Sequence, residues 1–229
     1  MKYLRAVVFA VSTILIYLGS SLLGWGIDDI PGFFALYPRV GYVIVVIGFG
    51  LAVGYQAIDA PEGISGNKGE SGKLIRRQTI IGSMMTILAF GMLVLLPWAD
   101  RRSIGVIFDN SFLRWLGLVF SGTGYWLIFW SGLALGKMYS AEVTIQKDHQ
   151  LITFGLYRYV RHPRYLGLIL VGLGLTSLFR SGIGLVAFIL LVGLLLLRIQ
   201  DEEKLMYQEF GVEWQAYCQR SWHLIPYVY

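Results

Sequence analysis

Two short polar segments near the C-terminus carry side chains that could contact a charged ligand. The first, residues 155–165, combines arginines, tyrosines and a histidine. Pro163 pushes the residue before it out of helical geometry, and Gly155 permits backbone conformations that other residues avoid. The second holds Arg198 and Glu202, four residues apart and so on one helix face. Together they offer cations, carboxylates and backbone groups to a polar ligand.

Long apolar runs surround these segments and predict a membrane protein. The chain has 229 residues, of which 56% are hydrophobic and 14% charged, with a mean hydropathy of +0.62. This composition is too apolar for an ordinary soluble domain. Four runs are each close to the roughly 20 residues that a helix needs to cross the hydrocarbon core. These runs are residues 4–23, 40–58, 79–98 and 112–135.

A fifth apolar stretch, residues 165–197, would be roughly 50 Å long as one helix, which is too long for an upright span. Arg180 stands at its middle, where a charge facing lipid is costly. We therefore predict a hairpin of two shorter helices with Arg180 at the far membrane surface. This hairpin returns Arg198 to the side of the first polar segment. The chain after Arg198 is typical of a helix that leaves the membrane along its surface.

The predicted fold class is all-α: a polytopic integral membrane protein of about six transmembrane helices. The last two form the C-terminal hairpin, and a cytoplasmic interfacial helix follows them. Basic residues at the N-terminus, in a flexible loop over 59–78 and in 137–164 place both termini in the cytoplasm. Arg101, Arg102 and Arg114 count against this orientation. The net charge of +5 suits lipid head groups, and we assign no nucleic-acid role.

Several familiar site types are excluded by the sequence. The glycine-rich part of the 59–78 loop lacks phosphate-loop spacing, and Leu74 replaces the Ser or Thr that would hold magnesium. No GxGxxG follows a strand, which excludes a soluble Rossmann site. The one cysteine, Cys218, cannot form an internal disulfide. We expect His149 and His223 to be surface histidines and predict no metal site.

The two polar segments also resemble a known enzyme family. The chain is similar to isoprenylcysteine carboxyl methyltransferases, which are related to phospholipid methyltransferases, over about its last 90 residues. The match consists of two blocks joined by the apolar hairpin. The blocks read His149-x-Leu151-Ile-x-x-Gly155-x-Tyr157-x-x-x-Arg161-His162-Pro163-x-Tyr165-x-Gly167 and Arg198-x-x-x-Glu202-Glu203, with Phe210-Gly211, Tyr217 and Ile225-Pro226 following in order.

The resemblance implies an enzyme that uses S-adenosyl-L-methionine. Arg161 would pair with the cofactor carboxylate. Arg198 and Glu202 are the predicted catalytic residues, and Arg198 would orient an anionic acceptor in a way that lysine cannot reproduce. Residues 139–229 would form the cofactor-binding and catalytic region, and residues 1–138 four spans on the substrate-access side. The predicted cofactor-binding residues are His149, Leu151, Gly155, Tyr157, Arg161, His162, Pro163, Tyr165, Glu202 and Glu203.

The sequence leaves the methyl acceptor open. The favoured reading is carboxyl O-methylation of a lipophilic or amphiphilic acceptor, such as a prenylated cysteine, beside membrane lipids. Phospholipid N-methylation and small-thiol S-methylation are alternatives. A membrane sterol-type reductase using NADPH and a non-enzymatic scaffold are alternatives from other classes. In the scaffold, Arg198 and Glu202 would be only a helix surface pair, worth about 0.3–0.5 kcal/mol.

Overall fold

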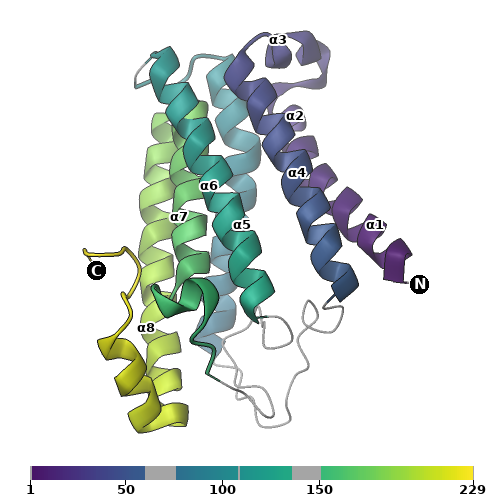
Figure 1. The fold of residues 1–229 in the computed structure, drawn as a ribbon. Coiled ribbons are helices and arrows are strands. Elements are labelled where there is room, and N and C mark those ends of the chain that lie inside the picture. Colours follow the sequence, from purple (N-terminus) through teal and green to yellow (C-terminus); the bar gives the residue numbers. More distant parts are fainter. Residues whose placement is uncertain (1, 60–75, 108, 136–150, 229) are drawn as a thin grey trace.

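The structure, a computed structural model, describes residues 2–59, 76–107, 109–135 and 151–228. These residues form a bundle of long helices without a β-strand (Figure 1). Five helices are long and apolar enough to cross a membrane, and a sixth apolar helix is shorter. The prediction of an all-α multi-pass membrane protein with about six spans is therefore confirmed.

The N-terminal half supplies four of these spans, as predicted. The first begins with α1 (Lys2–Ile14) and continues through one π-helical turn, Leu15–Gly19, into α2 (Ser20–Trp25). A short helix, α3 (Ile30–Phe34), then covers one end of the bundle. The other three spans are α4 (Tyr37–Asp59), α5 (Arg76–Arg101) and α6 (Ser111–Leu135).

The loop predicted over residues 59–78 is shorter than expected. Residues 76–78 already belong to α5, and Arg77 and Gln78 have partners on a distant helix that the sequence does not reveal. Residues 60–75 lie outside the described part of the chain.

The C-terminal hairpin is present, with α7 (Pro163–Leu178) and α8 (Gly182–Gln219) as its arms. Arg180 lies in the turn with a positive φ of 50°, and the Ser181 side chain accepts from the Gly184 backbone at the start of α8. The separate surface helix expected after Arg198 was wrong in one respect. α8 continues without a break and bends only at Gly211, where φ is 47°. No residue before Gly211 interrupts the helix, so extending it costs less than starting a new one.

Glycines bring α6 and α7 into close contact and so fix where α7 begins. A Cβ on Gly124 would lie 2.6 Å from the Gly167 carbonyl oxygen, and one on Gly174 would lie 2.6 Å from that of Gly117. Only glycine permits this approach, which in membranes replaces the hydrophobic effect as a packing force. The first turn of α7, which carries the predicted site residues, is therefore held rigidly against α6.

A buried charged cluster ties several helices together at the end opposite the first turn of α7. The Asp100 side chain is 1% exposed and receives two hydrogen bonds of 3.0 Å from Arg114. Arg180 from the hairpin turn donates to it at 2.8 Å, and Arg39 lies 3.9 Å away. Arg114 therefore neutralises an internal carboxylate, which explains why it fits a charge-based orientation poorly.

Candidate functional site

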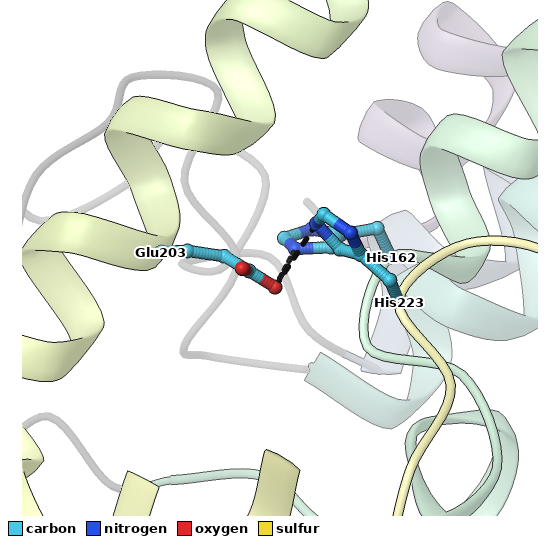
Figure 2. A group of neighbouring side chains, drawn as sticks. All are labelled: His162, Glu203 and His223. Carbon is cyan, nitrogen blue, oxygen red and sulfur yellow. Dashed lines mark hydrogen bonds and ion pairs between the residues drawn. The ribbon is translucent and has the colours of Figure 1, made fainter. Parts of the chain in front are cut away.

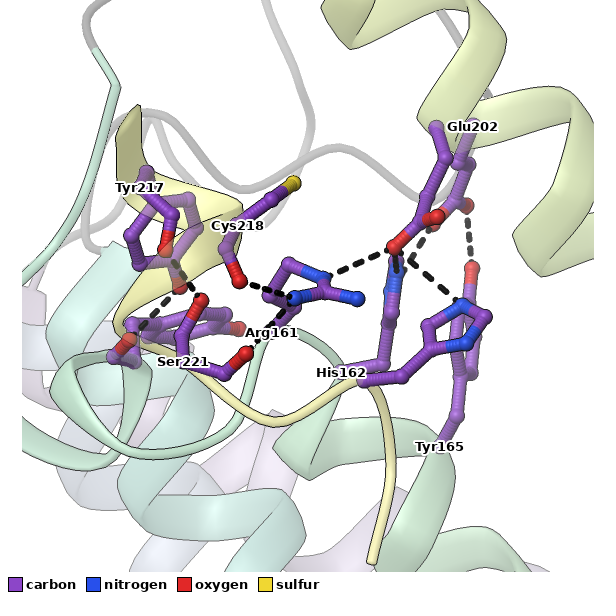
Figure 3. A network of polar contacts seen from close by, with 10 residues as sticks. Arg161, His162, Tyr165, Glu202, Tyr217, Cys218 and Ser221 are labelled. Carbon is purple, nitrogen blue, oxygen red and sulfur yellow. Dashed lines mark hydrogen bonds and ion pairs between the residues drawn. The ribbon is translucent and has the colours of Figure 1, made fainter. Parts of the chain in front are cut away.

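The two polar segments meet at one end of the bundle, as the hairpin predicted (Figure 3). Proline at the first position of α7 starts the helix, and His162 before it is non-helical, with φ −123° and ψ 55°. Nε2 of His162 lies 3.2 Å from Oε1 of Glu203, and the Tyr165 hydroxyl donates to Glu202. Residues about 40 positions apart thus form one polar site.

Arg198 lies at the centre of this site and is 8% exposed. Its Nε donates to the Tyr165 hydroxyl at 2.9 Å and to Oε1 of Glu202 at 3.3 Å. Its Nη1 lies against α5, where a Cβ on Gly82 would be only 3.0 Å away. Gly82 therefore leaves room for the guanidinium, which is held through Nε by two partners.

An apolar cavity of about 710 Å³ adjoins Arg198, within the range of ligand pockets. Its lining on α5 extends from Gln78 to Leu93, roughly 22 Å along the helix at 1.5 Å per residue. Its polar lining at the Arg198 end includes Arg164 and Tyr165. The cavity thus joins a charged end to a long apolar interior. Apolar lining residues include Met85, Phe90, Leu168, Leu175 and Leu191.

Gln78 and Asp201 extend the site toward α5. The Gln78 amide nitrogen donates to one carboxylate oxygen of Asp201, and Arg77 donates to the other at 3.1 Å. Both Gln78 and Asp201 are buried. The sequence analysis missed this pair, which lies 123 positions apart. The one available signal was that Asp201 follows Arg198 by three residues, on the same helix face.

Arg161 is held by the protein's own acceptors. Its Nε donates to Glu203 at 2.9 Å, and its Nη1 donates to the carbonyls of Cys218 and Ser221 at 3.1 and 2.7 Å (Figure 3). The Arg161 backbone nitrogen also donates to the Trp222 carbonyl at 2.8 Å. Arg161 thereby fastens the C-terminal segment over the site. Its pairing with a cofactor carboxylate stays a prediction.

His162, Glu203 and His223 form a compact group whose potential ligand atoms all lie within 4.8 Å of one another (Figure 2). Nε2 of each histidine is 3.2 Å from Oε1 of Glu203. This spacing would suit a divalent cation, but Arg161 lies 2.9 Å from the same oxygen and already supplies positive charge. We therefore interpret the group as hydrogen-bonded, and the absence of a metal site stays a prediction.

The expectation of a surface position for His223 was wrong, because its side chain is only 14% exposed. Burial lowers the pKa of His223 and favours the neutral imidazole. Nothing near His223 in the sequence indicated a partner, since Glu203 lies 20 positions earlier on another element.

Other predicted cofactor-binding residues lie along the same segment. Leu151 is half-buried, and Gly155 has a φ of 61°, which favours glycine. The buried Tyr157 accepts a 2.6 Å hydrogen bond at its carbonyl from the Tyr217 hydroxyl. Pro163 is fully buried. Their contact with a cofactor stays a prediction, and His149 lies outside the described residues.

Residues 115–208 match the model of the "Isoprenylcysteine carboxyl methyltransferase (ICMT) family". The matched range begins in α6 and ends in α8. It therefore contains His162, Tyr165, Arg198, Glu202 and Glu203.

Curated relatives agree with this match. A rice protein (Oryza sativa subsp. indica) named "Probable protein-S-isoprenylcysteine O-methyltransferase" is 29% identical over 153 residues, 66% of this chain and 80% of the relative. "Protein-S-isoprenylcysteine O-methyltransferase A" of Arabidopsis thaliana is 22% identical over 166 residues, 69% of this chain and 78% of the relative. The Schizosaccharomyces pombe "Protein-S-isoprenylcysteine O-methyltransferase" is 34% identical over 83 residues, 36% of this chain and 35% of the relative. The first two alignments are too long to fit within the last 90 residues or so, so the similarity extends into the N-terminal helices.

Proposed function

By its residues 115–208 and its curated relatives, the chain belongs to the isoprenylcysteine carboxyl methyltransferase family, and we propose that it methylates the carboxylate of a prenylated cysteine. It is a methyltransferase, and we propose S-adenosyl-L-methionine as the methyl donor. One observation carries the choice of acceptor: Arg198 lies at the charged end of a long apolar cavity. An anionic head on an isoprenoid chain matches both halves of that cavity.

The cavity is suited to the isoprenoid chain. Its lining is mostly apolar and extends along α5 within a candidate membrane span. An acceptor already dissolved in the bilayer gains by exchanging lipid contacts for protein contacts only if its charged end also finds a partner. Arg198 is that partner, because a guanidinium can hold a carboxylate through two parallel hydrogen bonds.

The neighbouring carboxylates suit the methyl donor. Tyr165 and Arg198 both contact Oε1 of Glu202, while its Oε2 is 3.8 Å from Nδ1 of His162. Carboxylates in this setting can accept hydrogen bonds from the ammonium and ribose hydroxyl groups of S-adenosyl-L-methionine. Glu203 would contribute in the same way. The residues present therefore fit the cofactor.

The reaction asks little of the protein beyond positioning. S-adenosyl-L-methionine supplies an electrophilic methyl group: a carboxylate oxygen attacks that carbon, the carbon–sulfur bond breaks, and its electron pair stays on sulfur, giving a neutral thioether and a methyl ester. A carboxylate is already ionised, so no general base is needed. Arg198 orients the acceptor, and the apolar walls exclude water.

We also propose that both termini face the cytoplasm. The N-terminus, the first turn of α7 and the second half of α8 lie toward the same end of the bundle (Figure 1). At the other end, Arg114 is paired with Asp100, and Arg101 is paired with Asp28 at 2.8 Å. These pairs weaken the objection raised by the positive charges there. A protease site added at either terminus should be cut only from the cytoplasmic side, and cleavage from the opposite side would reverse the orientation.

The class of enzyme can be tested by ligand binding. We expect detergent-purified protein to bind S-adenosylhomocysteine saturably in a calorimetric titration and to give no heat with NADPH. Binding of NADPH alone would move the chain to the reductases. Binding of neither ligand would favour the scaffold reading.

Glu202→Gln should weaken S-adenosylhomocysteine binding by roughly 1.5–3 kcal/mol, because it removes a charged hydrogen-bond acceptor. Glu209→Gln is a matched control, since Glu209 is exposed further along α8. Calorimetry on both variants measures the difference. Equal affinities for the two variants would remove Glu202 from the cofactor site.

Gly82→Ala should lower kcat/KM roughly tenfold, because small displacements of a positioning group are costly. The new Cβ would lie 3.0 Å from Nη1 of Arg198 and push the guanidinium aside. Stability should not fall, since alanine favours a helix over glycine by about 0.8–1.0 kcal/mol. Gly91→Ala on the same helix has no neighbour within 4 Å and should leave kcat/KM unchanged. Steady-state kinetics with thermal unfolding tests both, and full activity of Gly82→Ala would mean that Arg198 needs no such space.

A further inference from the structure

Gln78 brings a buried acceptor to the charged end of the cavity. Its side chain lines the cavity, and the residue is 4% exposed. Because its Nε2 donates to Asp201, whose carboxylate can only accept, the orientation of the amide is fixed. Oε1 has no hydrogen-bond partner among the described residues. A buried polar atom in this state calls for a donor from a ligand.

Gln78 lies beside Arg198 for two independent reasons. Gly82, against which the Arg198 guanidinium lies, is one helical turn after Gln78 on the same face of α5. Asp201, which holds the Gln78 amide, is three residues after Arg198 on the same face of α8. Asp201 is itself fixed by Arg77 at 3.1 Å. The amide oxygen and the guanidinium are therefore placed together.

We propose that Oε1 of Gln78 accepts a hydrogen bond from the amide N–H of the acceptor cysteine while Arg198 holds its carboxylate. The amide nitrogen and the carboxylate of a C-terminal cysteine are bonded to the same carbon, so the groups that recognise them must be neighbours. Gln78 then selects a cysteine that ends a peptide over a prenyl thioether acid without an amide. This assignment rests on the proposed function.

The test compares two acceptors that differ only at this position. One is N-acetyl-S-farnesylcysteine, and the other is S-farnesyl-3-thiopropionic acid, which has hydrogen in place of the acetamido group. We expect the wild-type protein to favour the first in kcat/KM by roughly tenfold, as for one buried hydrogen bond. Gln78→Leu should abolish most of this preference by lowering kcat/KM for the first acceptor, with little change for the second.

Gln56→Leu is the matched control. The Gln56 amide donates across helices to the Phe129 carbonyl at 2.6 Å, but Gln56 does not line the cavity. The same substitution there should leave the ratio of the two kcat/KM values at its wild-type level. Thermal unfolding of both variants reports any loss of stability.

Several results would overturn the assignment. Equal losses for both acceptors in Gln78→Leu would make Gln78 only a tie between α5 and α8. If Gln78→Leu does not fold, the wild-type protein still decides, because equal kcat/KM values for the two acceptors would leave no role for the amide. Either result leaves the proposed function intact, whereas methylation of neither acceptor by wild-type protein would contradict that function itself.

Discussion

Arg198→Lys is expected to lower kcat by about 10²–10³, the range seen when a charge-stabilising donor is removed from an active site. The guanidinium uses Nε for Tyr165 and Glu202 while Nη1 lies against α5 beside the cavity. A lysine ammonium concentrates its donors on one atom and cannot maintain both sets of contacts. Affinity for S-adenosylhomocysteine should change little, so the loss should appear in turnover at saturating cofactor.

Initial rates and calorimetry together test this expectation. Arg158→Lys is a suitable control, because Arg158 is exposed and lies in the same motif segment without contacting Arg198, Tyr165 or Glu202 in the described contacts. Its kinetics should match the wild type. If Arg198→Lys instead lost cofactor affinity and kept kcat, Arg198 would belong to the cofactor half of the site.

Asp100→Ala is expected to destabilise the protein by about 3–5 kcal/mol, the cost of leaving buried charges without their partner. Asp100 is the acceptor for Arg114 and Arg180, and Arg39 lies 3.9 Å from it. The substitution would leave cations uncompensated in a bundle that has little access to water. The effect should be structural, with the cofactor site at the other end disturbed only through unfolding.

Asp109→Ala provides the comparison. Asp109 also contacts Arg180, at 2.6 Å, but its side chain is 71% exposed, and exposed pairs contribute about 0–1 kcal/mol. Denaturant or thermal unfolding in one detergent should therefore separate the two variants clearly. Similar stabilities for the two variants would mean that burial of Asp100 does not make its ion pairs important.

The spans could be predicted from sequence because bilayer thickness sets their length. Four apolar runs matched α1–α2, α4, α5 and α6 to within a few residues at most ends, and Arg180 correctly marked the hairpin turn. The C-terminal half of α8 was harder to predict. Charges at residues 201–203 suggested a new surface element, but Asp201 and Glu203 have partners on other segments and the helix continues through them.

The site was predictable where its residues are close in sequence. Tyr157, His162 and Tyr165 share one segment, and Arg198 and Glu202 share one helix face, so local pattern was enough. Gln78 and His223 were missed because their partners come from distant elements. Such pairs depend on how helices pack, which neither hydropathy nor motif spacing encodes.

The most direct test of the proposed reaction asks which atom receives the methyl group. Wild-type protein in lipid would be incubated with methyl-labelled S-adenosyl-L-methionine and N-acetyl-S-farnesylcysteine, and the product would then be treated with mild alkali. We predict that the label enters the farnesylcysteine and is released as methanol, as expected for a methyl ester. Label that stays on a phospholipid amine or on a thiol sulfur after alkali would contradict carboxyl methylation.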